Sequence, residues 1–278
     1  MKRAQKNITE RTQAVWGTKP AGHTHASQET PGTKQYFEQV LKGRFTHEHY
    51  WLAEFVDYSA WKHKKVLEIG CGAGYDAFMF ANNGAQYTGI DLTPQNIVLT
   101  QKHLDYYNLS ASIIQMDATQ LTLQEKFDLV YSFGVLHHIP DIELALQNIH
   151  QVLADDGQFY CVVYNKNSVF YWGNLFLTWI MSGGFFRENF KTRLARIEFT
   201  MSNELPHVDV YSKLQLKKIF KKAGFEITDL SVHQLNREDF PSFFKLKYLW
   251  GRIPQSWLIR AGRYVGWYVC IKAKKSIV

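Results

Sequence analysis

Three acidic residues stand at comparable places in the first half of the chain, each beside a short apolar run. Glu68 precedes a glycine-rich stretch, Asp91 ends the run that begins at Gln86, and Asp117 follows residues 112–116. A turn or a helix cap would explain one acid alone. Neither explains three acids at successive strand ends. Strand ends of an open α/β sheet meet at one edge, where ligands bind. Asp91 can accept from both hydroxyls of a ribose, and Asp117 suits an adenine amino group.

The glycine-rich stretch narrows the ligand further. Gly70, Gly72 and Gly74 are spaced Gly-x-Gly-x-Gly, and Tyr75 stands where a dinucleotide-binding loop would need its third glycine. The Gly-Lys-Ser/Thr ending of a phosphate-binding P-loop is absent, and no lysine or arginine lies nearby to neutralise a phosphate. With Glu68 just before the loop, the pattern favours a cationic ligand or a network of donors over an anionic ligand.

The elements that would hold these residues alternate between strand and helix. Such alternation predicts an α/β fold, a doubly wound and mostly parallel sheet with right-handed crossovers and helices on both faces. We expect strands at residues 66–69, 86–90, 112–116, 127–132, 158–164, 225–233 and 265–273, and helices at 73–83, 94–107, 141–154 and 213–223. Asp155-Asp156-Gly157 is expected to form a turn before the fifth strand.

Four segments together resemble a known family. They are Val66 to Gly74 (Val-Leu-Glu-Ile-Gly-Cys-Gly-Ala-Gly), Gly-Ile-Asp-Leu-Thr-Pro, Gln-Met-Asp-Ala, and Phe-Asp-Leu-Val-Tyr-Ser-Phe-Gly-Val-Leu-His-His-Ile-Pro-Asp. The chain resembles the class I S-adenosylmethionine-dependent methyltransferases, in particular the ubiquinone/menaquinone-type group. The resemblance covers residues 62–165 and 212–233. It implies a Rossmann-like seven-stranded sheet and S-adenosyl-L-methionine as cofactor, and says little about the substrate.

The resemblance also implies roles for individual residues. The glycine loop would approach the methionine part of the cofactor, and the strand ends would hold its ribose and adenine. The cofactor-binding residues implied are Glu68, Gly70, Cys71, Gly72 and Gly74 at the loop, Asp91 at the ribose, Leu92, Asp117 and Ala118 at the adenine, and Ser132 and Phe133 at the methionine end.

Methyl transfer is a displacement at an already activated carbon, so a base is needed only when the acceptor is a hydroxyl or a protonated amine. His137 and His138 follow the fourth strand at the expected substrate entrance, and Tyr164 ends the fifth. Each is a candidate catalytic residue, and simple packing is the alternative for each. The His-x-His pairs at 23–25 and 47–49 have no third ligand at a recognised spacing, so no metal site is predicted.

Four segments describe the domain organisation. Residues 1–61 form an N-terminal arm and helices over the cofactor site, with residues 1–35 a loose arm that contains at most one short helix. Residues 62–164 form the cofactor-binding core, 165–211 an inserted aromatic and basic helical cap, and 212–278 complete the sheet with a second aromatic and basic segment. The cap aromatics, among them Trp172, Phe176, Trp179 and Phe186, either line an acceptor pocket or form the cap's own core.

The net charge of the chain restricts the classes of binding partner but does not identify one. The net charge is +7 and the pI about 9.1, which suits nucleic acid, an anionic membrane or an anionic substrate. The run from Asn167 to Phe186 carries no charge and is long enough to cross a bilayer, but its polar residues favour a cap helix. Three scattered cysteines and an N-terminus without an apolar signal region indicate a cytoplasmic protein.

The function predicted is transfer of a methyl group to a small-molecule acceptor that is hydrophobic or membrane-associated, at the inner face of a membrane in the latter case. A cofactor-binding scaffold without catalysis and an RNA methyltransferase are the alternatives, although no RNA-binding module is present and nucleic acid is the weaker partner. A nicotinamide oxidoreductase is disfavoured by Tyr75.

Overall fold

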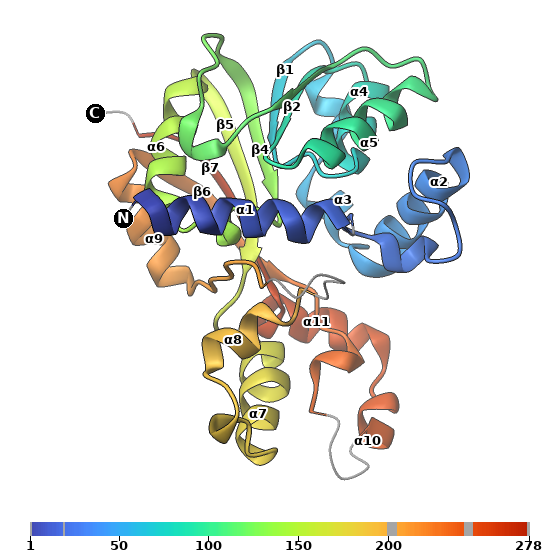
Figure 1. The fold of residues 1–278 in the computed structure, drawn as a ribbon, viewed down its shortest axis with the longest axis vertical. Helices are drawn as coiled ribbons and strands as arrows, with labels where there is room; N and C mark the ends of the chain where they lie inside the picture. Colours follow the sequence, from blue (N-terminus) through green and yellow to red (C-terminus); the bar gives the residue numbers. More distant parts are fainter. Residues whose placement is uncertain (1, 19, 199–204, 242–246, 277–278) are drawn as a thin grey trace.

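A seven-stranded sheet forms the centre of the molecule (Figure 1). The computed structural model describes residues 2–18, 20–198, 205–241 and 247–276. The strand order is β3-β2-β1-β4-β5-β7-β6, and β7 is antiparallel to both of its neighbours. The strands are β1 (Lys65–Ile69), β2 (Gln86–Asp91), β3 (Ser112–Gln115), β4 (Phe127–Phe133), β5 (Leu153–Tyr164), β6 (Phe225–His233) and β7 (Tyr268–Lys275). The predicted doubly wound, mostly parallel sheet is confirmed.

Two apolar cores cover the two faces of this sheet. On one face lie α3 (Leu52–Phe55), the 3₁₀ helix η3 (Tyr58–Trp61), α4 (Tyr75–Asn82) and α5 (Pro94–Asp105), and on the other lie α6 (Ile142–Val152) and α9 (Lys213–Lys222). Because helices cover both faces, a central strand such as β1 is apolar along most of its length, and only its first residue is exposed. The layers hold the carboxyl ends of the parallel strands at one edge.

Predicted boundaries around β5 and before β7 are wrong. The helix predicted to run to residue 154 ends at Val152. Residues 155–157, predicted as a turn, lie inside β5, which begins at Leu153. The pairing of β4 with β5 shifts between Phe127 and Leu129, and this irregularity takes up the Asp-Asp-Gly sequence within the strand. The last strand begins at Tyr268 rather than 265, because helix α11 (Gln255–Val265) runs up to it.

The N-terminal segment is helical, so the predicted loose arm is wrong. Helix α1 spans Lys2–Thr18 and is followed by the 3₁₀ helix η1 (His23–Ala26), α2 (Lys34–Gly43) and the π-helical η2 (Arg44–Glu48). Val15 is fully buried, and the side-chain amide of Gln13 donates to the Leu92 carbonyl at 2.9 Å. These contacts hold α1 across the end of the sheet (Figure 1), where the binding residues were predicted.

The cap after β5 is a separate lobe of short helices. It comprises the π-helical η6 (Phe170–Leu177), α7 (Thr178–Met181), η7 (Gly184–Phe186) and α8 (Phe190–Ala195). Phe176 packs on Trp179 and Phe190 with ring centroids 6.0 and 5.2 Å apart, so these three rings belong to the cap's own core, whereas Trp172 and Phe186 are exposed. No helix in the described part of the chain is long and apolar enough to cross a membrane. The shorter helices are η4 (Ala118–Gln120), η5 (Leu136–His138), η8 (Arg237–Asp239) and α10 (Lys247–Gly251).

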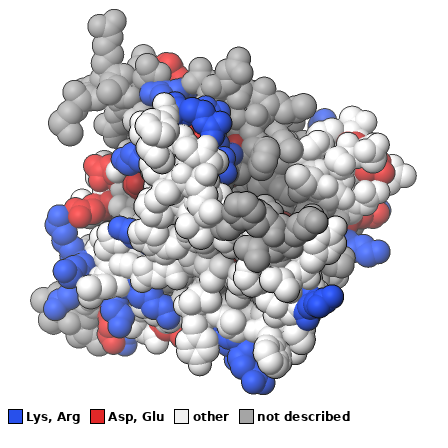
Figure 2. Space-filling model, turned by 90° about the horizontal axis from the view of Figure 1, so that it is seen from below, with Lys and Arg blue, Asp and Glu red and all other residues white. Residues whose placement is uncertain are grey.

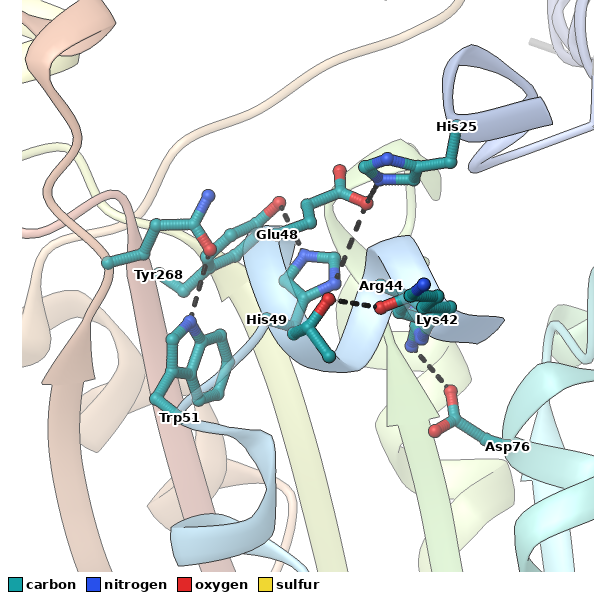
Figure 3. A network of polar contacts seen from close by, with 10 residues as sticks. His25, Lys42, Arg44, Glu48, His49, Trp51, Asp76 and Tyr268 are labelled. Carbon is teal, nitrogen blue, oxygen red and sulfur yellow. Dashed lines mark hydrogen bonds and ion pairs between the residues drawn. The ribbon is translucent and has the colours of Figure 1, made fainter. Parts of the chain in front are cut away.

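A buried ion pair fastens the N-terminal segment to the core (Figure 3). Arg44 of η2 donates to Asp76 of α4 at 2.6 Å, and both side chains are almost fully buried. Tyr58 donates to the other carboxylate oxygen at 2.5 Å, and the guanidinium lies 4.4 Å from the centre of the Phe133 ring. Each partner would be a buried unpaired charge without the other, so the segment that carries Arg44 is positioned against α4.

We expect Asp76→Ala to lower the free energy of unfolding by about 3–5 kcal/mol, because it strands the Arg44 charge in the interior. Urea unfolding followed by circular dichroism measures this. The control is Glu143→Ala, which removes an exposed ion pair to Lys222 and should cost at most about 1 kcal/mol. Equal small losses in the two variants would show that the Arg44–Asp76 pair contributes no more than a surface pair.

Candidate functional site

A cavity opens where the carboxyl ends of β1, β2 and β4 meet. Its floor is the glycine loop, its sides are the strand ends and the segment after β4, and α1 covers it. Among the sequence-predicted residues, the cavity is lined by Gly70, Gly72, Asp91, Leu92, Asp117, Ala118, Phe133 and His138. The sequence therefore predicted most of the cavity wall that belongs to the sheet.

The Asp91 carboxylate organises the floor of the cavity. One of its oxygens accepts from the Gly72 amide at 2.9 Å, and the other accepts from the Thr93 amide at 2.8 Å and from Asn96 at 3.2 Å. Burial raises the pKa of this carboxyl, while these hydrogen bonds act in the opposite direction. The acid thus joins β2, the glycine loop and the start of α5, and its remaining acceptor capacity faces the cavity.

Two glycines of the loop have different physical reasons for being glycine. Both Gly70 and Gly72 have positive φ, at 79° and 57°. A Cβ on Gly70 would lie 2.3 Å from a methyl of Val135, so this residue must be glycine for the loop to pack on the segment after β4. A Cβ on Gly72 would meet no atom within 4 Å, so Gly72 borders open space that a ligand can fill.

Four of the predicted cofactor residues lie behind the cavity wall. Glu68 is buried and accepts a hydrogen bond from the Tyr87 hydroxyl, and burial raises its pKa. Ser132 donates to the Ile69 carbonyl at 3.3 Å. Cys71 and Gly74 pack against Thr100 of α5. Side chains in these positions support the loop, and their part in binding stays a prediction.

The charged residues that line the cavity are acidic. Two aspartates line it, and no lysine or arginine is among its lining residues in the described part of the chain. An anionic group such as a pyrophosphate would lack a cationic partner there, whereas a sulfonium or a set of hydroxyl donors would be matched. The donor and acceptor set therefore fits S-adenosylmethionine better than a dinucleotide.

The sequence predicted an N-terminal segment over the site, but it singled out none of the α1 residues that line the cavity. Ile8, Thr12 and Trp16 of α1 line it, and the Trp16 ring meets His138 edge-on with centroids 5.3 Å apart. These three residues are spaced four apart, which places them on one face of a helix. That spacing was the available signal, but the polar composition around it favoured a loose arm.

His138 is held in one tautomer with a free nitrogen. Its Nδ1 lies 2.8 Å from the His207 carbonyl, which can only accept, so Nδ1 carries the proton. Its Nε2 has no hydrogen-bond partner among the described residues and lies 3.7 Å from a carboxylate oxygen of Glu198. Burial lowers the pKa of His138, and the charge of Glu198 opposes this. A neutral imidazole with its lone pair on Nε2 is the form of a general base.

Glu198, which the sequence did not single out, comes from the cap and completes this cluster. It accepts from the Tyr164 hydroxyl at 2.6 Å, and burial raises the pKa of Tyr164 well above its usual value, so the phenol keeps its proton. His137 packs on the Tyr164 ring at 3.8 Å and neither of these two lines the cavity. His137, His138 and Glu198 each place a donor atom within 4.8 Å of the others, a spacing at which they could also share a cation.

We expect the imidazole of His138 to titrate below 6.5 and to carry its proton on Nδ1 when neutral, because of burial and the His207 carbonyl. Nitrogen-15 NMR of the histidine side chains reports both properties. Glu198→Gln removes the opposing charge and should lower that pKa further, whereas Glu188→Gln, elsewhere in the cap, should leave it unchanged. A pKa at or above 6.5, or a proton on Nε2, would contradict the geometry.

Comparisons with known proteins show the family of the chain. A family model described as a methyltransferase domain matches residues 44–230. A ubiquinone biosynthesis O-methyltransferase from Pseudomonas syringae pv. tomato is 32% identical over 37% of this chain and 46% of its own length. One from Glaesserella parasuis is 30% identical over 39% and 48%. The chain thus spans about half the length of the curated relatives that it matches.

Solved structures share the fold at low sequence identity. A magnesium protoporphyrin IX methyltransferase from Synechocystis, solved with bound SAH, is 14% identical, covers 99% of each chain and has a TM-score of 0.55. The cyclase SpnF is 18% identical, covers 90% of this chain and 86% of its own, and has a TM-score of 0.56. At these identities the likeness concerns the fold.

Proposed function

The chain belongs to the class I S-adenosylmethionine-dependent methyltransferases, and we propose that it transfers the methyl group of this cofactor to a hydroxyl of a small, hydrophobic acceptor. The observation that carries the proposal is the pairing of two features at one cavity. Asp91 and the open Gly72 loop suit the methyl donor, and His138, whose Nε2 has no hydrogen-bond partner among the described residues, lines the same cavity.

The residues present fit the cofactor by their own geometry. Asp91 would hold the ribose hydroxyls, and Leu92, Asp117 and Ala118 would surround the adenine. Gly72, with open space at its Cβ position, would let the backbone approach the methionine part. The bound cofactor would supply a methyl group activated by the sulfonium charge. No lysine or arginine is among the described lining residues, so no positive side chain there would repel the sulfonium.

The chain's own part in the reaction is positioning and proton removal. Trp16 and the rest of α1 would exclude water from the cavity and fix the reacting groups near one another. His138 Nε2 would accept the proton of the acceptor hydroxyl as the oxygen attacks. The Glu198 carboxylate would stabilise the imidazolium that forms, and the hydrogen bond from Tyr164 holds that carboxylate in place.

The acceptor would enter between α1 and the cap. A hollow there is lined by Ile8, Ala195, Leu205 and Val208, together with Lys191, and Ile8 also lines the main cavity. Its apolar wall beside a cationic edge suits an aromatic or aliphatic molecule that carries an anionic group. The O-methyltransferase names of the curated relatives support oxygen as the acceptor atom.

A cofactor-binding protein without methyl transfer is the second candidate. One structure with the same fold is a cyclase, so the fold alone does not decide the reaction. Binding of the cofactor without turnover over a broad panel of acceptors, RNA included, would favour this candidate.

We expect Asp91→Ala to weaken S-adenosylmethionine binding about 10- to 100-fold, the range for losing one hydrogen bond to a charged group. Isothermal titration calorimetry measures it. Asp105→Ala, which removes an exposed acid at the far end of α5 and outside the cavity lining, should bind as the unaltered chain does. Asp91→Asn keeps one acceptor oxygen, so its affinity should lie between those of Asp91→Ala and the unaltered chain, provided that both Asp91 variants melt normally. Unaltered binding by folded Asp91→Ala would refute the assignment of this acid.

We expect His138→Gln to lower kcat about 10²- to 10⁴-fold, as loss of a general base does, with little change in cofactor affinity. The activity of the unaltered chain should fall as the pH drops through the His138 pKa, which lies below 6.5, because the protonated ring cannot accept a proton. S-adenosylhomocysteine formation with a panel of hydrophobic phenols measures both.

His150→Gln, a histidine on α6 away from the cavity, is the matched control and should keep full activity. If His138→Gln retains the activity and acid limb of the unaltered chain, the base is another group. If EDTA abolishes activity and a divalent cation restores it, the His137–His138–Glu198 cluster binds a metal rather than serving as a base.

A further inference from the structure

Two lobes extend from the same end of the sheet (Figure 1). Both present large apolar side chains to solvent. One is the cap, residues 170–196, and the other comprises α10 and α11, residues 247–265; we call them the cap lobe and the C-terminal lobe. Phe186 is 84% exposed and Trp257 67% exposed. The other exposed apolar residues are Trp172, Leu177, Ile180, Met181 and Phe185 on the cap lobe and Tyr248, Leu249 and Tyr264 on the C-terminal lobe.

The shape of the cap tip is fixed by its packing. Gly183 adopts a left-handed turn with φ of 67°, and a Cβ on Gly184 would lie 2.3 Å from the Trp179 ring. The turn therefore sits directly on Trp179, and the following Phe185 and Phe186 are pushed outward, with their rings 4.2 Å apart. Their exposure follows from a close-packed turn and is a property of the folded lobe.

The charge of the whole chain is concentrated on these two lobes. The cap lobe carries four cations and one acid, a net +3, and the C-terminal lobe carries four cations and no acid, a net +4. The formal charge of the chain is +7, so the remainder is neutral in sum. Figure 2 looks at this end of the molecule: most of the described surface is white, blue groups lie around it, and red groups are few and marginal.

An arginine-lined hollow lies behind the aromatic tip. Its wall contains Arg187, Arg193 and Arg196, with Thr178, Trp179, Ser182, Gly184 and Glu188. The Nε of Arg196 donates to a carboxylate oxygen of Glu188 at 2.7 Å, and Arg187 donates to the Ser182 carbonyl at 2.6 Å. The Nε atom of Arg193 and the ring nitrogen of Trp179 are shielded from water and have no partner among the described residues. Three arginines against one acid give the hollow a net positive charge, which suits the oxygens of a phosphate.

We propose that this face docks on an anionic phospholipid membrane, with Phe185 and Phe186 inserted among the lipid chains and the arginine hollow receiving a lipid phosphate. Aromatic and aliphatic side chains surrounded by arginines suit the boundary between head groups and hydrocarbon, and each cation near an anionic surface adds to the attraction. Aliphatic residues such as Ile180 and Met181 on the tip suit lipid chains and offer nothing for stacking with nucleic acid bases. The docking is independent of the reaction at the cavity and goes beyond it.

Flotation of the full chain with lipid vesicles tests this. We expect binding to vesicles of phosphatidylcholine with phosphatidylglycerol, at least tenfold weaker binding to pure phosphatidylcholine, and weakening by salt. Phe185→Ser with Phe186→Ser should reduce binding at least tenfold. Leu214→Ser, an equally apolar exposed residue on α9, is the matched control and should bind normally.

The hollow is tested separately by charge-matched variants. Arg187→Gln with Arg193→Gln should lose the preference for phosphatidylglycerol, whereas Lys217→Gln with Lys218→Gln, which removes the same charge from exposed positions on α9, should keep it. Equal losses in the two pairs would overturn the hollow as a phosphate site. Competition by millimolar inorganic phosphate would mean that the hollow takes free phosphate as well as the head group.

Other outcomes would overturn the docking itself. Failure to float with phosphatidylglycerol vesicles would do so, as would retention of RNA by the same face without vesicle binding. A dimer in sedimentation that the double phenylalanine variant dissociates, again without vesicle binding, would assign the face to a second copy of the chain. Normal melting and cofactor affinity in every variant show that only the face has changed.

Discussion

A buried carboxylate must be surrounded by donors, and in this chain that requirement at Asp91 determines the site. The acid draws the Gly72 amide, the Thr93 amide and Asn96 toward one point, and so fixes the glycine loop against the end of β2 and the start of α5. Gly70 and Gly72 adopt the positive φ that this arrangement needs. These contacts determine the cavity wall on the sheet side. The N-terminal segment and the cap complete the cavity from the other sides.

The outer elements are attached by long-range contacts. Arg44 binds Asp76 and holds the segment between α1 and the sheet, and Gln13 binds the Leu92 carbonyl and holds α1 over the cavity. On the other side, Glu198 brings the cap into contact with Tyr164 and His138. The charges of the molecule are therefore separated in space. Two aspartates and His138 are among the residues that line the cavity, and the net positive charge lies on the lobes at the end of the sheet.

The sequence predicted the parts of the molecule that depend on local chemistry. The strand and helix ranges of the core, the acids at the strand ends and the glycine loop all follow from neighbouring residues, and the order of elements restricts the sheet topology. Glu198 was missed because its role depends on a chain reversal that places residue 198 beside residue 138. Helix α1 was misread because its polar composition hides three lining residues spaced four apart, and only their burial against the sheet gives that spacing meaning. Residues 243 and 244, which belong to the aromatic and basic segment predicted within 212–278, lie outside the described residues.

The central claim is that the cavity at the strand ends holds the methyl donor with its reactive end toward His138. A crystal structure of the chain with S-adenosylhomocysteine, the demethylated product, tests it most directly. We expect the ribose hydroxyls within hydrogen-bonding distance of Asp91, the adenine beside Ala118, and the sulfur on the side of Gly134 and His138. Product bound elsewhere, or bound here with its sulfur directed away from His138, would contradict the account.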